Sequence, residues 1–211
     1  MFVIYLLAAY IIGSFPTAII AGKLLKKIDI RAYGSGNAGA TNVFRVLGWK
    51  PGLVVMIVDM LKGFVVVFYL SHIFPITGVD YSIIKVSGGL VAIFGHIFTL
   101  FAGFKGGKGV GTAAGVFLGL EPVSVLLCLL LFIFVVWTTR YVSLGSILAS
   151  AMLPVLILFK SIVFATPLVR TNFVISIILF LIIIITHLPN LKRLLSGTEN
   201  KLVFGKSGDK L

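Results

Sequence analysis

The sequence predicts an all-α, polytopic integral membrane protein with about seven transmembrane helices. Hydrophobic residues make up 59% of the chain and charged residues only 11%, whereas about a quarter of the residues in a soluble domain are charged. The apolar residues lie in long runs, and a helix needs about 20 of them to cross a bilayer. We therefore expect one transmembrane domain, residues 1–201, followed by a polar tail, residues 202–211.

The composition also limits the partners. The net charge is +12, but the cations are dispersed between apolar runs, so we expect no nucleic acid to bind. The lone cysteine, Cys128, lies inside an apolar run and allows neither a disulfide within the chain nor a cysteine metal cluster. We expect no metal and no cofactor. Two explanations of the positive charge remain open, namely membrane orientation and an anionic ligand.

The first half of the chain predicts three spans and two glycine-rich stretches. The first stretch, residues 34–48 (GSGNAGATNVFRVLG), suits a turn followed by a short interfacial helix. The second stretch, residues 95–112 (GHIFTLFAGFKGGKGVGT), combines glycines and lysines in a way that suits an anion-binding nest. A flexible loop with ordinary lysines is the alternative for this stretch. The three spans cover residues 2–22, 51–71 and 82–104.

The second half predicts three full-length spans and one short one. Residues 109–120 are apolar but few for a comfortable crossing, and Glu121-Pro122 ends the segment. The last span passes directly into a third polar stretch, residues 187–201 (HLPNLKRLLSGTENK). The full-length spans cover residues 122–139, 141–159 and 171–186, and residues 160–170 form a loop.

The distribution of charge predicts the topology. If residues 109–120 cross the bilayer, all three polar stretches lie on one side; otherwise the third lies opposite the other two. With the crossing, 14 of the 18 Lys and Arg residues lie on the shared side. The positive-inside rule then favours seven spans, with the N-terminus outside and the C-terminus cytoplasmic. The short crossing implies a thinned bilayer or a site sunk below the headgroups.

The shared face combines arginine, lysine and glycine backbone with few acids, and this set suits phosphate. It does not suit glycosidase chemistry, which needs two carboxylates. His187, at the membrane boundary near Asn190, is either a candidate general base or a structural histidine with satisfied hydrogen bonds. The deeper His96 is expected to be structural. Asp59 and Lys62, spaced i, i+3 within a span, predict a structural ion pair.

Two other functions use similar features. A transporter or channel for a phosphorylated solute or small anion would also place cations at broken helices. The sequence shows no internal repeat and no trail of polar residues through the bilayer, which disfavours a carrier. A lipid-binding scaffold without chemistry is the third option.

The three polar stretches, in this order, resemble the signature stretches of the acyl-phosphate-dependent glycerol-3-phosphate acyltransferases, the PlsY family. They cover 48 of the 211 residues, and the first two are specific in combination. Residues 140–146 (RYVSLGS) and 59–63 (DMLKG) are also similar. Thr99 departs from the proline that the family commonly has there. The resemblance implies a multi-pass protein of the bacterial cell membrane with its active site on the cytoplasmic face.

The resemblance also implies the reaction. A fatty acyl phosphate and glycerol 3-phosphate would give 1-acyl-glycerol 3-phosphate and inorganic phosphate, the first step of phospholipid synthesis. An acyl phosphate is already activated, so hydrogen-bond donors at the carbonyl oxygen and leaving phosphate can supply most of the catalysis. The attacking hydroxyl needs a proton acceptor, which is His187 or a substrate phosphate. A hand-off from an enzyme that produces acyl phosphate is a further implication.

Family resemblance and chemistry together assign roles. The expected catalytic residues are Ser35, His187 and Asn190. Phosphate or substrate binding is expected at Ser35, Gly36, Asn37, Thr41, Asn42, Arg45, Lys105, Gly106, Gly107, Lys108, Gly109, Arg140, Ser143 and Arg193. Structural support is expected from Asp59, Lys62, His96 and Glu199, the last by pairing with a nearby cation.

Overall fold

The computed structural model describes residues 1–165, 167 and 169–202, and these residues form helices and no strand. Most of the expected polar tail, residues 203–211, lies outside the described residues. Six segments of the described chain are long and apolar enough to cross a membrane, and a shorter apolar helix, α7, lies between the third and the fourth of them. The all-α membrane fold expected from the sequence is therefore confirmed.

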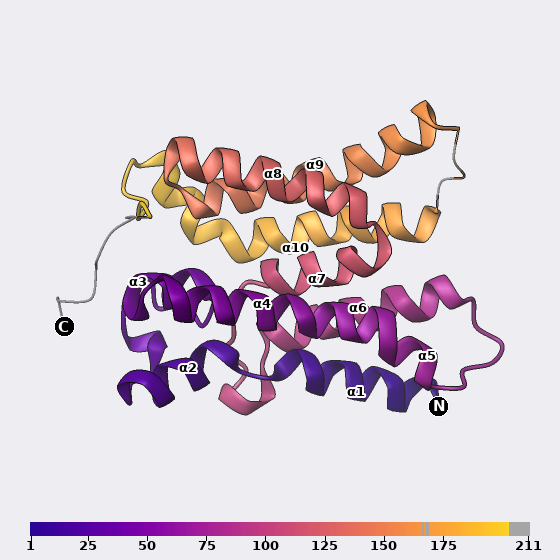
Figure 1. Ribbon diagram of the computed structural model, residues 1–211, viewed down its shortest axis with the longest axis horizontal. Helices are drawn as coiled ribbons and strands as arrows, with labels where there is room; N and C mark the ends of the chain where they lie inside the picture. Colours follow the sequence, from indigo (N-terminus) through magenta and orange to yellow (C-terminus); the bar gives the residue numbers. More distant parts are fainter. Residues whose placement is uncertain (166, 168, 203–211) are drawn as a thin grey trace.

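The helices form two layers with one short helix between them (Figure 1). The first layer contains α1 (Phe2–Ser14), α2 (Thr17–Lys26), η1 (Ile30–Ala32), α3 (Ala40–Leu47), α4 (Trp49–Val65), η2 (Val66–Leu70), α5 (Ser71–Ile73), α6 (Tyr81–Ile97) and η3 (Leu100–Ala102). The second layer contains α8 (Pro122–Thr139), α9 (Val142–Val163) and α10 (Arg170–Leu195). The short helix is α7 (Val110–Leu120).

Local sequence explains the interruptions of the first two spans. The first span breaks between α1 and α2 at Pro16, which lacks the N–H group that a continuous helix requires. The second span stays continuous from α4 through the π-helical turn η2 into α5. The short interfacial helix expected after Gly39 is α3, whose Asn42 and Val43 are buried.

Helix α7 joins the two layers and packs closely against α4. A Cβ atom at Gly115 would overlap the carbonyl oxygen of Met60, and one at Gly63 would overlap the carbonyl oxygen of Thr112. Only glycine allows the two backbones to approach this closely. Val116, which lies beside Gly63, and Phe117 belong to the main apolar core, which also contains residues of α9 and α10. Helix α7 is therefore an interior helix enclosed by the rest of the bundle.

Two details refine the sequence expectation. The third span reaches Ala102, close to the expected end, but its helix α6 ends at Ile97, because the chain then doubles back and Gly106 N–H donates to the Ile97 carbonyl at 2.9 Å. This return starts α7 level with the last turn of α6, which shortens the distance that its 11 residues must cover. The third polar stretch is helical as far as Leu195, since α10 continues through Pro189.

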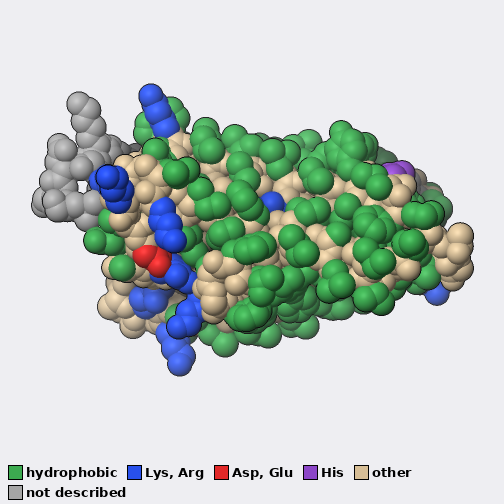
Figure 2. Space-filling model, turned by 90° about the horizontal axis from the view of Figure 1, so that it is seen from below, with side chains coloured by type: hydrophobic (Ala, Val, Ile, Leu, Met, Phe, Trp, Pro, Cys, Tyr) green, Lys and Arg blue, Asp and Glu red, His purple; other side chains and the backbone are tan. Residues whose placement is uncertain are grey.

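The two ends of the bundle differ in charge. At one end, Glu121 accepts hydrogen bonds from Lys160 at 2.5 Å and from Asn172 at 3.0 Å, which ties the start of α8 to α9 and α10. The three polar stretches lie at the opposite end, because the other termini of α9 and α10 point there. Figure 2 shows Lys and Arg side chains gathered at one end and hydrophobic side chains along the length of the molecule. Helix α7 thus connects the two ends, as a seven-span arrangement requires.

This arrangement predicts the sidedness of single cysteines introduced after Cys128 is replaced by serine. We expect Lys192→Cys to react with an impermeant maleimide only from the cytoplasmic side, because the cation-rich end should face inward. Phe164→Cys, beyond the far end of α9, should react only from outside. Labelling of intact cells and of inverted vesicles measures both. Reaction of Lys192→Cys in intact cells would contradict the orientation.

Candidate active site

The three polar stretches meet where the two layers approach each other. Lys108, in the loop before α7, donates through its Nζ atom to Oδ1 of Asn190 on α10. Arg45, on α3, donates through Nη2 to the carbonyl oxygen of Asn200 at 2.9 Å. The first and second stretches therefore each contact the third. We refer to Arg45, Lys108, His187, Asn190 and Glu199 as the inner centre.

Helix α10 places His187 and Asn190 three residues apart on its buried face. Nδ1 of His187 lies 2.9 Å from the carbonyl oxygen of Ile183. A carbonyl can only accept, so in the neutral ring Nδ1 carries the hydrogen and Nε2 carries the lone pair. The side chain of His187 is buried, with 4% exposure. Nε2 is therefore the atom of this ring that can accept a proton from a bound hydroxyl.

Glu199 fixes the orientation of Asn190. Its carboxylate accepts hydrogen bonds from Ser143 at 2.9 Å, from Asn190 Nδ2 at 2.7 Å and from Arg193 Nε at 2.7 Å. The bond from Nδ2 turns Oδ1 of Asn190 toward Lys108. Burial raises the pKa of the Glu199 carboxyl, but these three hydrogen bonds and the charge of Arg193 outweigh it and lower the pKa below its ordinary value. Glu199 is therefore ionised at neutral pH.

The inner centre carries more positive than negative charge. Arg193 pairs with Glu199 at 2.7 Å, which leaves the charges of Arg45 and Lys108 to be balanced. Burial lowers the pKa of Lys108 to about 8, with Glu199 raising it and Arg193 and Arg45 lowering it further. Burial also lowers the pKa of Arg45, and its Nε atom is buried without a hydrogen-bond partner among the described residues. Unbalanced buried cations are costly, so this site favours binding of an anion.

The first stretch is held in shape by Asn42. Its Nδ2 donates to the carbonyl oxygens of Ile30 at 2.9 Å and Tyr33 at 3.0 Å. Its Oδ1 accepts from the backbone N–H of Ser35 at 2.8 Å and from the Ser35 hydroxyl at 3.2 Å. Asn42 is 1% exposed, so its amide supports the loop and is not directed at solvent, whereas Ser35 lies at the surface.

A cleft of about 480 Å³ lies between the first and second stretches, and we call it the outer cleft. Its walls come from both stretches and from the turn before the first one. The lining residues are Asp29, Arg31, Ala32, Gly36, Lys105 and Gly106. The two lysines of the loop therefore lie in different parts of the site: Lys105 lines the outer cleft and Lys108 belongs to the inner centre.

The backbone of the glycine–lysine loop, residues 103–109, is partly used within the fold. The N–H groups of Gly106 and Gly107 donate to the carbonyl oxygens of Ile97 and His96, the last two of α6, at 2.9 and 3.1 Å. From the sequence, these two N–H groups were expected to bind phosphate. The N–H groups at the start of α7 remain as donors, because the first turn of a helix has no internal acceptors. Gly109 immediately precedes that helix and has a left-handed φ of 86°.

A buried ion cluster supports this loop from below. Asp59 lies 2.6 Å from Lys62 Nζ and 3.0 Å from the Thr17 hydroxyl. Nδ1 of His96 lies 3.7 Å from the same carboxylate. A Cβ atom at Gly107 would overlap Nε2 of His96, so the loop rests directly on this ring. The structure thus places Asp59, Lys62 and His96 beneath the site and outside the inner centre.

The remaining predicted residues surround these two places. Asn37 and Thr41 are half-buried in the first stretch. Arg140 is an exposed, left-handed residue that ends α8, and its carbonyl oxygen accepts from Leu202 N–H at 2.8 Å. This bond holds residues 196–202 across the end of the bundle. Sequence reasoning missed Asn200, Asp29 and Arg31, although the Asp-x-Arg spacing just before the first stretch was visible.

Comparison with known proteins gives a consistent result. The family described as glycerol-3-phosphate acyltransferase matches residues 3–197. A glycerol-3-phosphate acyltransferase from Chlorobium luteolum is 45% identical over 96% of this chain and 97% of its own length. The protein of the same name from Chlorobaculum tepidum is 47% identical over 97% and 98%.

Solved structures show the same fold. Two crystal structures of PlsY (YgiH), an integral membrane glycerol 3-phosphate acyltransferase, superpose on this chain at 36% identity. The glycerol 3-phosphate form has a TM-score of 0.83 and covers 96% of both chains. The lysophosphatidic acid form has a TM-score of 0.81 and covers 96% of this chain and 95% of its own. This chain therefore belongs to the PlsY family of membrane glycerol-3-phosphate acyltransferases.

Proposed function

We propose that this membrane acyltransferase moves a fatty acyl group from acyl phosphate to the 1-hydroxyl of glycerol 3-phosphate. The products are 1-acyl-glycerol 3-phosphate and inorganic phosphate. The observation that carries the proposal is the excess positive charge of the inner centre beside Nε2 of His187. Related structures in glycerol 3-phosphate and lysophosphatidic acid forms support the acceptor and the product.

The inner centre suits the acceptor substrate. Arg45 and Lys108 would hold its phosphate, because a guanidinium and an ammonium provide charge-assisted hydrogen bonds. His187 and Asn190 would lie near the hydroxyl that attacks. Asn190 supports this geometry indirectly, since Glu199 holds its amide in one orientation. Arg193 and Ser143 act through Glu199 and brace the centre.

The outer cleft suits the phosphate of the donor. Ser35, Gly36 and Lys105 line or border it, with Asn37 and Thr41 close by in the first stretch. Arg140 lies at the other border of the site and can attract a second anion. Donors for the developing oxyanion would be the N–H groups at the start of α7, after Gly109. Asn42, Gly106 and Gly107 hold these surroundings in place.

The reaction requires no cofactor in this scheme. The hydroxyl oxygen attacks the acyl carbonyl carbon, the bond from that carbon to the phosphate oxygen breaks, and phosphate leaves with the electron pair. The hydroxyl proton passes to Nε2 of His187 or to a substrate phosphate. An acyl phosphate needs little help to expel its leaving group, so positioning and electrostatic stabilisation supply most of the rate.

The membrane setting follows from the same proposal. The cation-rich end would face the cytoplasm of a bacterial cell, where soluble glycerol 3-phosphate can reach it. The acyl chain of the donor would stay in the bilayer beside the apolar helices. The donor would arrive from an enzyme that makes acyl phosphate, either through the membrane or by direct hand-off.

The donor is tested with purified protein in detergent and radiolabelled glycerol 3-phosphate. We expect 1-acyl-glycerol 3-phosphate and inorganic phosphate in equal amounts from acyl phosphate. We expect no product from the matching acyl-coenzyme A, which has a thioester and releases no phosphate. Product from the thioester and none from acyl phosphate would overturn the proposed donor. No product from either would overturn the proposed function.

The charge of Lys108 predicts a pH dependence. Its pKa of about 8 lies below the ordinary value, so its charge is lost as the pH rises through about 8. The ratio kcat/KM reports groups of the free enzyme, and for glycerol 3-phosphate it should fall by up to about tenfold per pH unit above 8. Lys108→Arg should remove this fall, because arginine stays charged. A wild-type ratio that rises through pH 8 would contradict phosphate binding by Lys108 and indicate that its neutral amine is a base.

His187→Ala separates the two proton acceptors. If His187 is the general base, kcat should fall by about 10² to 10⁴-fold, which is typical of losing such a group. If a substrate phosphate accepts the proton, the loss should be smaller and appear mainly in KM. His72→Ala, an exposed histidine at the other end of the bundle, is the control and should leave both constants unchanged. Unchanged constants in His187→Ala would remove His187 from the site.

A further inference from the structure

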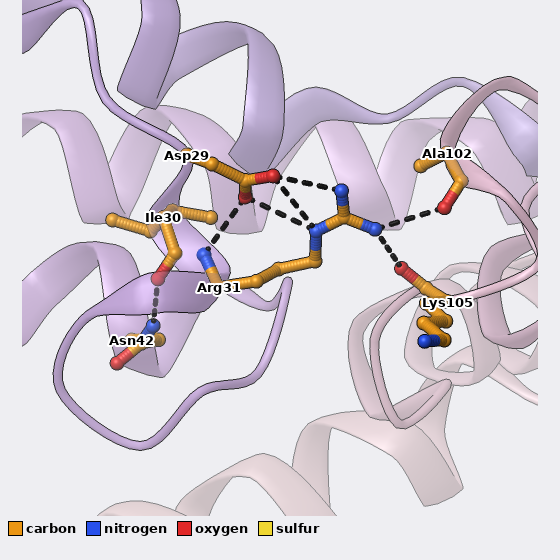
Figure 3. Close-up of polar contacts among 6 residues, drawn as sticks. All are labelled: Asp29, Ile30, Arg31, Asn42, Ala102 and Lys105. Atoms are coloured by element: carbon orange, nitrogen blue, oxygen red, sulfur yellow. Dashed lines mark hydrogen bonds and ion pairs between the residues drawn. The ribbon is translucent and has the colours of Figure 1, made fainter.

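The turn before the first stretch contains an arginine that contacts both halves of the outer cleft. Arg31, in η1, donates through Nη1 to the carbonyl oxygens of Ala102 at 2.8 Å and Lys105 at 3.4 Å. Those two carbonyls lie 71 and 74 residues away in the sequence. Figure 3 shows the guanidinium between Asp29 on one side and Ala102 and Lys105 on the other.

Asp29 sets the orientation of this guanidinium. Its carboxylate accepts from Arg31 Nη2 at 2.7 Å and from Nε at 3.1 and 3.2 Å. It also accepts a hydrogen bond from the backbone N–H of Arg31 at 3.0 Å. Asp29 therefore contacts both the main chain and the side chain of Arg31. The hydrogen bond from Arg31 lowers the pKa of the Asp29 carboxyl. The edge of the guanidinium that faces away from Asp29 is therefore directed at the glycine–lysine loop.

The two carbonyls that Arg31 contacts lie on either side of a tight turn. Gly103 and Phe104 form this turn with φ values of 65° and 59°. Two successive left-handed residues, one of them not glycine, are unfavourable unless the surroundings fix them. Arg31 contacts the backbone before and after the turn, so it fixes the position of the Lys105 main chain. Lys105 in turn lines the outer cleft.

The same segment is fastened to the first stretch. Asn42 Nδ2 donates to the carbonyl oxygen of Ile30, the residue before Arg31, at 2.9 Å (Figure 3). Asn42 belongs to α3, which also carries Arg45. A continuous chain of hydrogen bonds therefore runs from α3 through Asn42 and Arg31 to the loop that carries Lys105 and Lys108.

We propose that Arg31, held by Asp29, is a positioning residue that couples the first stretch to the glycine–lysine loop and so sets the geometry of the outer cleft. It does not bind substrate itself, because its N–H groups are directed at Asp29 and the loop carbonyls. This role rests on the proposed function, in which the outer cleft holds the donor phosphate. A surface ion pair without this role would contribute little.

The test compares Arg31→Lys, Arg31→Gln and Asp29→Asn with Lys26→Gln, which removes an exposed cation from the neighbouring helix α2. Lysine keeps the charge, but its compact ammonium lacks the planar fork by which Arg31 presents Nε and Nη2 to Asp29 and Nη1 to the loop. We expect KM for acyl phosphate to rise about tenfold in Arg31→Lys and Asp29→Asn, as expected for losing about one charge-assisted hydrogen bond. We expect kcat to change less than KM. The variant that combines Arg31→Lys with Asp29→Asn should have the same KM as Arg31→Lys alone, because both substitutions disrupt one interaction. Lys26→Gln should match the wild type.

A second measurement does not depend on activity. Limited trypsin digestion in detergent, followed by mass spectrometry, reports how readily the loop is cut after Lys105. We expect faster cleavage there in Arg31→Lys and Arg31→Gln than in the wild type, with the unfolding temperature little changed. Unchanged KM and unchanged cleavage in both Arg31 variants would overturn the inference. If the wild-type protein is inactive with acyl phosphate, the proposed function is overturned. The cleavage rates alone then test whether Arg31 positions the loop.

Discussion

One buried carboxylate that accepts hydrogen bonds from a serine, an asparagine and an arginine organises the site end of this protein. Glu199 accepts hydrogen bonds from Ser143, Asn190 and Arg193, which come from α9 and α10. Asn190 then reaches Lys108 in the other part of the bundle. Because this carboxylate cannot also neutralise Arg45 and Lys108, the centre is ordered and electrostatically unbalanced. That combination favours a bound anion over an empty site.

The fold supplies this centre by an unusual use of a short helix. Eleven residues of α7 connect the two ends of the bundle, and two structural features make this length sufficient. The loop after α6 doubles back onto His96, and glycines let α7 lie directly against the backbone of α4. The start of α7 and Lys108 are consequently set below the surface, beside α10. The membrane enzyme thus gains a polar, buried centre without a polar path across its apolar core.

The sequence predicted the spans and the grouping of the three polar stretches well, because hydropathy and charge depend on composition alone. It predicted less about the hydrogen bonds within the stretches. Gly106 and Gly107 have the composition of a nest, but their N–H groups pair with α6, and only the path of the chain reveals this. Arg31 lies outside every stretch that was singled out, and its contacts with Ala102 and Lys105 are long-range. The sequence also did not indicate that the third stretch is helical as far as Leu195, because a proline such as Pro189 usually ends a helix.

In the proposed mechanism, the inner centre binds a phosphate through a charged Lys108. Isothermal titration of glycerol 3-phosphate into the purified protein, in two buffers of different ionisation enthalpy, measures this binding most directly. At pH 8, where Lys108 with a pKa of about 8 is half charged, binding should take up about half a proton per site. Lys108→Arg should abolish this uptake at pH 8, because arginine stays charged. Binding at pH 8 with no proton uptake, or with proton release, would contradict the account.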